Sequence, residues 1–118
     1  MIYVILVSHG ELAGGLKTAV QMMTGKREEL LAISLKDEMD SGSYESGFRE
    51  LTAELRPEDR ILLFADIQGG SPLTSAIAVL AEKGLLKNAE VFTGMNMAMV
   101  LTAVLMKDAM PMEELCAH

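Results

Sequence analysis

The chain has 118 residues, a formal net charge of −7 and a composition that is 50% hydrophobic but only 4% aromatic. This length suffices for one domain with an aliphatic core, and the acidic balance excludes the basic surface that nucleic-acid binding requires. The single cysteine, Cys116, excludes an internal disulfide bond and fits a reduced, cytoplasmic location. Ten methionines predict either an adaptable interior or an apolar surface that meets a partner.

Neither a signal peptide nor a membrane-spanning segment is expected. The first residues form a short apolar run with no basic region before it, which is untypical of a signal peptide. The longest apolar stretch, residues 97–106, is far shorter than the ~20 residues that span a bilayer. Because no repeat, low-complexity tract or linker interrupts the chain, we expect residues 1–118 to form one domain.

The first part of the chain predicts a strand, a helix and a second strand. Residues 2–7 are a continuous β-branched and aliphatic run, which is the pattern of a strand buried on both faces. A helix follows with Gly25 as its C-terminal cap, and residues 30–35 form the second strand. The apolar face of this helix comprises Leu12, Leu16, Ala19, Val20 and Met23.

The middle of the chain predicts a second helix and a third strand. Apolar residues at helical spacing predict a helix over residues 44–55, shortly before Pro57. Residues 61–65 form a buried strand that ends at Asp66, and residues 68–72 form a loop. The apolar face of this second helix comprises Tyr44, Phe48, Leu51 and Leu55.

Two more helices and a fourth strand are predicted toward the C-terminus. An amphipathic helix begins at Leu73 and closes near Gly84, and residues 90–93 form a short strand. Residues 97–106 are apolar nearly all round, which predicts a buried helix or a subunit interface.

Strands thus alternate with helices along the chain. This pattern predicts an α/β fold, a single doubly wound domain with a mainly parallel central sheet flanked by helices on both faces. In such a fold, ligands bind beyond the carboxyl ends of the strands, where the strand order reverses. The residues expected at that edge are Ser8, His9 and Gly10, Lys36 and Asp37, Asp66 to Pro72, and Gly94, Met95 and Asn96.

His9 and Asp66 are the residues of this edge that could perform nucleophilic catalysis. His9 follows the first strand and precedes a glycine that lets the backbone turn tightly. A carboxylate at Asp66 that accepts from one imidazole nitrogen would leave the other nitrogen free to attack. The alternatives are a turn histidine bonded to nearby backbone and an aspartate that caps a helix or turn. His118, the last residue, is assigned no role.

The segment Gly69-Gly70-Ser71-Pro72 is suited to an anion. Ser71 is expected to be the N-cap of the next helix and Pro72 its first helical residue. The glycines bring bare backbone N–H groups close to a ligand, and the helix N-terminus adds partial positive charge that favours phosphate. The alternative is an ordinary, well-capped turn. The segment is neither a P-loop nor the GxGxxG dinucleotide fingerprint.

Other chemistries have less support in the sequence. Metal catalysis usually needs about three protein ligands, and only His9 and Asp66 are obvious, so neither a metal site nor a cofactor is expected. A serine hydrolase would need the GxSxG elbow, which the chain lacks. Cys116 has no local motif that would activate its thiol.

Three segments of the chain share a recognisable pattern. They are Val7-Ser8-His9-Gly10 with Ala13, Gly15-Leu16 and Ala19, then Phe64-Ala65-Asp66-Ile67-Gln68-Gly69-Gly70-Ser71-Pro72, then Gly94-Met95-Asn96. Together they resemble the enzyme IIA component of the mannose-type (mannose/fructose/sorbose) sugar phosphotransferase system. The resemblance covers most of the chain in the right order, and Asp-x-x-Gly-Gly-Ser-Pro is its most specific part.

The resemblance implies a phosphotransferase that carries a phosphoryl group. His9 would accept phosphate through Nε2 from the phosphohistidine of the carrier HPr, while Asp66 holds Nδ1–H. The phosphate would pass to a histidine of a IIB component, which phosphorylates the sugar entering through the membrane components. Gly69, Gly70 and Ser71 would hold the phosphoryl oxygens, and an apolar surface around the site would meet HPr and IIB. The resemblance also implies a homodimer.

The chain departs from the family pattern at three places. The family often has proline where Ala98 stands, and Pro-Gly-Glu where this chain has Lys36-Asp37-Glu38. It usually continues beyond the position of His118 with more helix and a last strand that is exchanged between dimer subunits. If this strand is lacking, the dimer is affected, whereas all the proposed catalytic groups are retained.

Three other interpretations stay open at this point. The phosphocarrier subunit of dihydroxyacetone kinase is related, although a different loop is expected there in place of residues 69–72. A regulatory module of the same fold would accept a label on His9 without passing it onward. A plain α/β small-ligand binder would never be modified at His9. The sequence does not name the sugar.

Overall fold

In the described residues, 1–110 and 112–117, the computed structural model has four strands in one wholly parallel sheet, in the order β2-β1-β3-β4. His118 lies outside the described residues. The elements are β1 (Ile2–His9), α1 (Leu12–Thr24), β2 (Leu30–Leu35), α2 (Ser41–Leu51), β3 (Arg60–Ala65), α3 (Ser71–Glu82), η1 (Leu86–Asn88), β4 (Ala89–Phe92), α4 (Met97–Met106) and α5 (Met112–Ala117).

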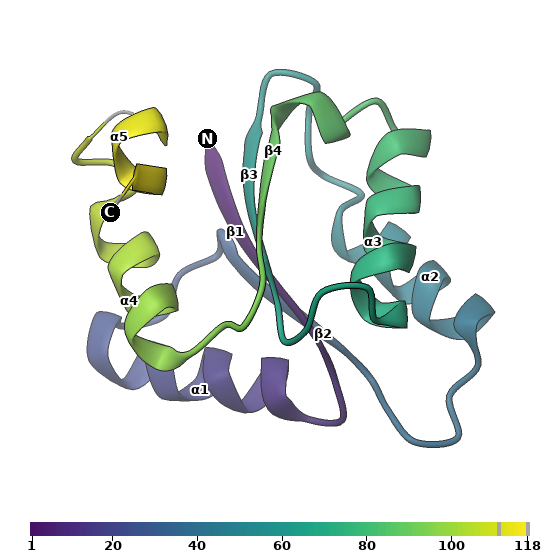
Figure 1. The fold of residues 1–118 in the computed structure, drawn as a ribbon. Helices are drawn as coiled ribbons and strands as arrows, with labels where there is room; N and C mark the ends of the chain where they lie inside the picture. The colour runs from purple at the N-terminus through teal and green to yellow at the C-terminus, as the bar shows by residue number, and fades with distance from the viewer. Residues whose placement is uncertain (111, 118) are drawn as a thin grey trace.

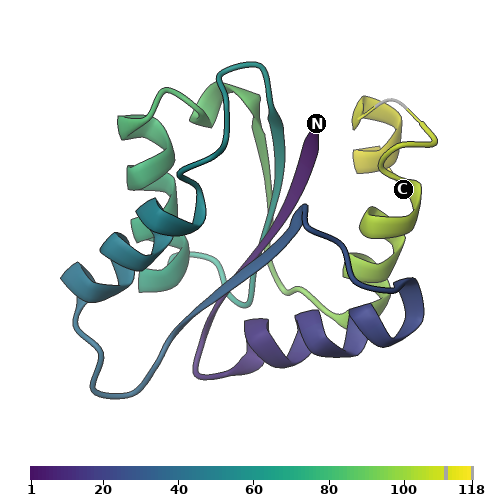
Figure 2. The same ribbon diagram turned by 180° about the vertical axis from the view of Figure 1, so that it is seen from behind.

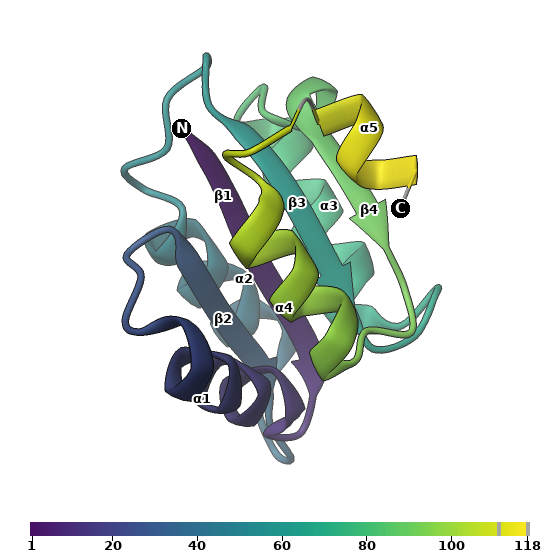
Figure 3. The same cartoon turned by 90° about the vertical axis from the view of Figure 1, so that its left-hand side faces the viewer.

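Helices cover both faces of the sheet. Figures 1 and 2 show α1 and α4 on one face and α2 and α3 on the other. In Figure 3 the α4 helix lies in front of the sheet, with α2 and α3 behind it. The α/β fold with a parallel sheet between two helical layers is therefore confirmed.

Residues 2–7 of β1 are apolar without interruption because helices cover both faces of the sheet. Val4 and Leu6 belong to the core beneath α1 and α4, whereas Ile5 and Val7 belong to the core beneath α2 and α3. All four side chains are fully buried. Since successive side chains of a strand point to opposite faces, a strand covered on both sides needs apolar residues at every position.

The strand order reverses between β1 and β3. The connection through α1 carries the chain from β1 to β2 on one side, and α3 carries it from β3 to β4 on the other. The first and third strands pair directly in parallel, with Val7 opposite Ala65. The carboxyl ends of these two strands therefore frame the crevice where doubly wound sheets bind ligands.

Two predicted boundaries near this crevice were wrong. β1 extends to His9, which is therefore the last residue of the strand rather than a turn residue. The N-cap of α3 is Gly70 and not Ser71, because the extended Gly70 residue already accepts the first helical hydrogen bond, from Thr74 N–H at 3.0 Å. Pro72 accordingly stands one position further into the helix than predicted.

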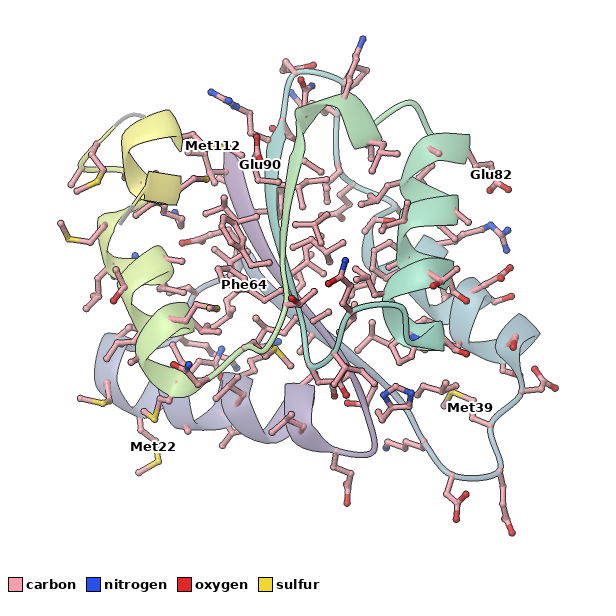
Figure 4. All side chains as sticks on the ribbon, in the orientation of Figure 1. Met22, Met39, Phe64, Glu82, Glu90 and Met112 are labelled. Carbon is pink, nitrogen blue, oxygen red and sulfur yellow. The ribbon has the colours of Figure 1, made fainter. Side chains whose placement is uncertain are left out.

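The first helix differs from the prediction in its buried face, and the second differs in its extent. In α1 the fully buried positions are Ala13 and Val20, whereas Leu12 and Met23 of the predicted apolar face are exposed. Figure 4 shows Met22 projecting from the same helix. α2 begins and ends earlier than predicted, since Asp40 caps its start by accepting from Ser43 N–H at 2.7 Å.

Of the two alternatives predicted for residues 97–106, a helix buried on all sides is not what the structure shows, and a subunit interface stays a prediction. α4 buries one side against the sheet, and Leu105 on the other side is 50% exposed. The chain then turns at Lys107, whose buried ammonium lies 3.3 Å from Glu29 and 2.7 Å from Asp108. The short helix α5 follows, which the sequence pattern had not indicated, and its Met112 and Leu115 join the same core.

Candidate functional site

His9 and Asp66 meet at the crevice between β1 and β3. His9 ends β1, and Asp66 is the first residue after β3, so the pairing of these strands brings the two residues together. The imidazole Nδ1 lies 2.9 Å from Asp66 Oδ2, and the His9 backbone N–H donates to the same oxygen at 2.9 Å. The carboxylate thus fixes both the ring and the backbone of His9.

The Asp66 carboxylate is held in its ionised form. Burial by itself would raise the pKa of Asp66, but the hydrogen bonds from the backbone N–H and ring of His9 and from Ile67 N–H outweigh this effect. The pKa of Asp66 is therefore lowered below its ordinary value. Ile67 N–H occupies the second oxygen, Oδ1, at 2.9 Å.

The geometry determines which imidazole nitrogen is free. An ionised carboxylate can only accept hydrogen bonds, so Nδ1 of His9 must be the donor. In the neutral ring the lone pair then resides on Nε2. The His9 side chain is 46% exposed while that of Asp66 is 15% exposed, so an incoming protein can reach the ring. Such a nitrogen can act as a nucleophile toward an electrophilic centre.

The backbone on either side of His9 is fixed by its neighbours. The buried Ser8 hydroxyl accepts from Ala13 N–H at 2.7 Å and so anchors the start of α1. Gly10 adopts the left-handed conformation at φ +59° and donates to Leu35 O of β2 at 2.9 Å. The tight turn expected of Gly10 therefore exists, and Ser8 supplies the cap that Glu11 at the N-cap position of α1 does not.

Gly70 lies directly against the ring of His9. A Cβ atom built on Gly70 would stand 2.8 Å from His9 Cε1, so the close approach requires a residue without a side chain. Gly69 precedes it at φ +79°, and Gly70 then begins α3. The N-terminus of this helix, with its free N–H groups and partial positive charge, is therefore beside the imidazole.

The structure brings some of the predicted site residues into contact with His9 and leaves others apart from it. His9, Asp66 and Gly70 are in contact. Gly69 is the adjacent turn residue, while Ser71 is exposed as the first residue of α3. Within the described residues, no hydrogen bond joins the Ser71 hydroxyl to His9.

A third segment closes the edge of the sheet beside Asp66. Gly94 N–H donates to Asp66 O at 3.1 Å, and Met95 N–H donates to Ala65 O at 3.1 Å. Asn96 then caps α4 by accepting from Met99 N–H at 2.9 Å. Of the predicted edge residues, Gly94 and Met95 therefore hold the backbone at the end of β3, and Asn96 begins α4.

The site is open rather than enclosed. An apolar pocket of about 440 Å³ lies elsewhere, beneath α4, where Phe64 stacks on Phe92. Figure 4 places Phe64 on the α4 side of the sheet and Met39 at the edge beyond β2. The His9 ring, 46% exposed at this edge, is therefore accessible from outside the molecule.

Neither a metal-ligand cluster nor a helix that could cross a membrane occurs among the described residues. Among residues 1–110 and 112–117, no three His, Cys, Asp or Glu side chains are placed so that they could hold a metal ion. In the same residues, no helix combines the length and apolar character that crossing a membrane requires.

Comparison with known proteins shows which family the chain matches. A family model described as the PTS system fructose IIA component, of the EIIA-man type, matches residues 3–118. The PTS system fructose-specific EIIA component of Bacillus subtilis is 23% identical over 115 residues, which cover 98% of this chain and 77% of that protein.

Solved structures show the same fold. The phosphotransferase system component EIIA from Streptococcus agalactiae has a TM-score of 0.82 at 24% identity, with 99% of this chain and 88% of that chain covered. The mannose/sorbose-specific IIA subunit from Enterococcus faecalis has a TM-score of 0.75 at 24% identity, with 87% and 75% covered. The resemblance found in the sequence is thus confirmed by the family model and by the fold.

Proposed function

The chain belongs to the family of PTS system fructose IIA components, of the mannose type, and from this premise we propose that His9 is its phosphorylated residue. The chain is thus a IIA component of a sugar phosphotransferase system. The observation that carries the proposal for His9 is the 2.9 Å contact between Nδ1 and Asp66, at the crevice between β1 and β3. It leaves Nε2 as the nucleophile on the exposed side of the ring.

The proposed step is a transfer between two imidazoles. The lone pair of His9 Nε2 attacks the phosphorus of a phosphohistidine on the donor protein. A new N–P bond forms on His9, and the N–P bond of the donor breaks, with its electron pair returning to the donor ring. The Nδ1 proton stays on His9, and the ionised Asp66 stabilises the positive charge that the phosphorylated ring acquires.

We propose that the start of α3 receives the phosphoryl oxygens. Gly70 touches the His9 ring, so a phosphoryl group on Nε2 would come close to the first N–H groups of α3. These N–H groups have no partner within the helix, and the helix dipole favours an anion there. Gly69, Gly70 and Ser71 are the residues assigned to this role.

The proposed partners follow from the family. HPr would be the donor and a IIB component the acceptor, which in turn serves the membrane components that admit the sugar. We further propose that residues 1–118 form a single IIA domain and that the protein acts as a homodimer. Exposed apolar residues beside the site, Leu12 and Ile67, would contribute to the contact with both carriers.

A labelling experiment tests the assignment of His9. The protein is incubated with labelled phosphoenolpyruvate, enzyme I and HPr, and the acid-labile phosphate that it gains is measured. His9→Gln should abolish the label, while His118→Gln, which removes the only other histidine, should retain it. A label that survives in His9→Gln would show that the phosphorylated residue has been wrongly assigned.

A second stage tests the role as a carrier. Addition of a IIB component from the same system should remove the label from the wild-type protein. Label that remains on His9 in the presence of the IIB component would favour a regulatory module of the same fold instead.

A further inference from the structure

Tyr44 is a buried residue whose hydroxyl reaches the first turn of α3, just after the loop that carries Asp66 and Gly70. It lies near the start of α2, at the edge of the sheet that also holds His9, and it is 1% exposed. Its hydroxyl donates to Pro72 O, in the first turn of α3, at 2.9 Å. A buried tyrosine on an apolar helix face needs such a partner for its hydroxyl, and here the partner belongs to the helix that borders the site.

The start of α2 is itself firmly placed. Asp40 caps the helix through Ser43 N–H at 2.7 Å, and Tyr44 N–H donates to Asp40 O at 3.2 Å. The phenol therefore extends from a fixed turn of α2 to the first turn of α3. α2 and α3 lie side by side on one face of the sheet, as Figures 1 and 2 show, so the hydroxyl sets the position of one helix start against the other.

The phenol is also coupled to the site electrostatically. Burial raises the pKa of Tyr44, and the negative charge of Asp66 raises it further. The hydroxyl consequently remains protonated and stays a hydrogen-bond donor when a dianionic phosphoryl group arrives nearby.

We propose that Tyr44 is a positioning residue for phosphoryl transfer, whose hydroxyl holds the first turn of α3 so that Gly70 rests against the His9 ring. The chain of contacts is short: the hydroxyl binds Pro72 O, Pro72 is two residues from Gly70, and Gly70 touches Cε1 of His9. Without the hydroxyl, the carbonyl loses its link to α2 and the turn can shift. The His9 ring and the first N–H groups of α3 are then no longer held in a fixed position relative to each other.

This inference rests on the proposed function, since the rate in question is the labelling of His9 by HPr. The test compares the wild-type protein with Tyr44→Phe and with Thr52→Val. Thr52 is the matched control because it ends the same helix, is 1% exposed, and donates a buried hydrogen bond to Phe48 O at 2.8 Å. Its removal weakens α2 at the far end from the site.

In Tyr44→Phe, the maximal rate of His9 labelling should fall roughly tenfold, because an ångström of misplacement can cost up to about 100-fold. The HPr concentration at half-maximal rate should change little, since no docking residue is altered. The Cε1–H proton resonance of His9 should also shift, because Gly70 lies against that atom. Thr52→Val should lose stability yet keep the wild-type rate and resonance.

Two results would overturn the role of Tyr44. One is a Tyr44→Phe protein with the wild-type rate and an unchanged Cε1–H resonance. The other is a Thr52→Val protein that is slowed as much as Tyr44→Phe, which would indicate general loosening of α2. A wild-type protein that takes no label refutes the proposed function instead, and the Cε1–H resonance then decides alone whether Tyr44 positions the ring.

Discussion

Replacing Gly70 with alanine should separate stability from phosphoryl transfer. The backbone at Gly70, with φ −77° and ψ 158°, is a conformation that alanine adopts readily. The added methyl would nevertheless stand 2.8 Å from His9 Cε1 and 3.2 Å from Ile67 Cγ1. The clash is therefore with side chains rather than with the backbone, and the half-exposed imidazole is the group that is able to move.

The size of the effect follows from these distances. Carbon atoms in contact prefer a separation of about 3.5–4.0 Å, so the ring must retreat by about 1 Å. That movement lengthens its hydrogen bond to Asp66 and turns Nε2 away from the start of α3. A displacement of this size can lower a transfer rate by up to about 100-fold. Stability should change by less than about 1 kcal/mol, since replacing glycine by alanine also restricts the unfolded chain.

The assay is the rate of His9 labelling by phosphorylated HPr, measured together with urea unfolding. Gly47→Ala is the matched control, because its methyl would clash at 2.9 Å with the end of another side chain, Ile33 Cδ1 of β2, away from the His9 ring. The Gly47→Ala protein should be as stable as Gly70→Ala or less stable, and it should be labelled at the wild-type rate. Wild-type labelling of Gly70→Ala would refute the argument that the ring position depends on this contact.

Two further predictions concern Asp66. Asp66→Asn should keep the fold but slow the labelling of His9 by roughly 10- to 100-fold, in line with the losses seen when the carboxylate partner of a metal-binding histidine is removed. Stopped-flow or quench-flow labelling measures the rate, and a normal rate would remove Asp66 from the mechanism. Because the folded pKa of Asp66 lies below its unfolded value of about 3.9, its stabilising effect is complete above that pH and is lost as the pH falls through the folded value. Urea unfolding at pH about 6 and about 2.5 should therefore show a difference between wild type and Asp66→Asn that shrinks in acid, and a difference independent of pH would contradict this account.

Local sequence pattern was sufficient for most of the architecture. The apolar runs of β1 and β3 predicted strands buried on both faces, and the structure buries residues 4–7 and 61–65. Gly25 and Gly84 stand just beyond the ends of α1 and α3 with positive φ, as capping glycines do. Such features depend on neighbours within a few residues, which is why periodicity and capping chemistry can predict them.

The errors of prediction arose where burial is decided by distant elements. The composition of α4 is apolar on all sides, but only the sheet and α1 determine which side is covered. Leu12 and Met23 lie on the predicted face of α1 yet remain exposed. They stand at the two ends of the helix, where the other described elements leave them uncovered. A helical pattern shows which residues could be buried, and the packing partner selects among them.

For the site, the sequence by itself determined the chemistry that was available: one histidine at the end of a strand, one aspartate after another strand and a glycine-rich helix start. Only the tertiary structure decided the geometry. His9 and Asp66 are 57 residues apart, and their 2.9 Å contact exists because β1 pairs with β3. The contact of Gly70 with the ring and the link from Tyr44 to Pro72 depend likewise on the register of the strands and the packing of α2 on α3. No local pattern encodes these distances, because they are set by how elements that are remote in sequence come together.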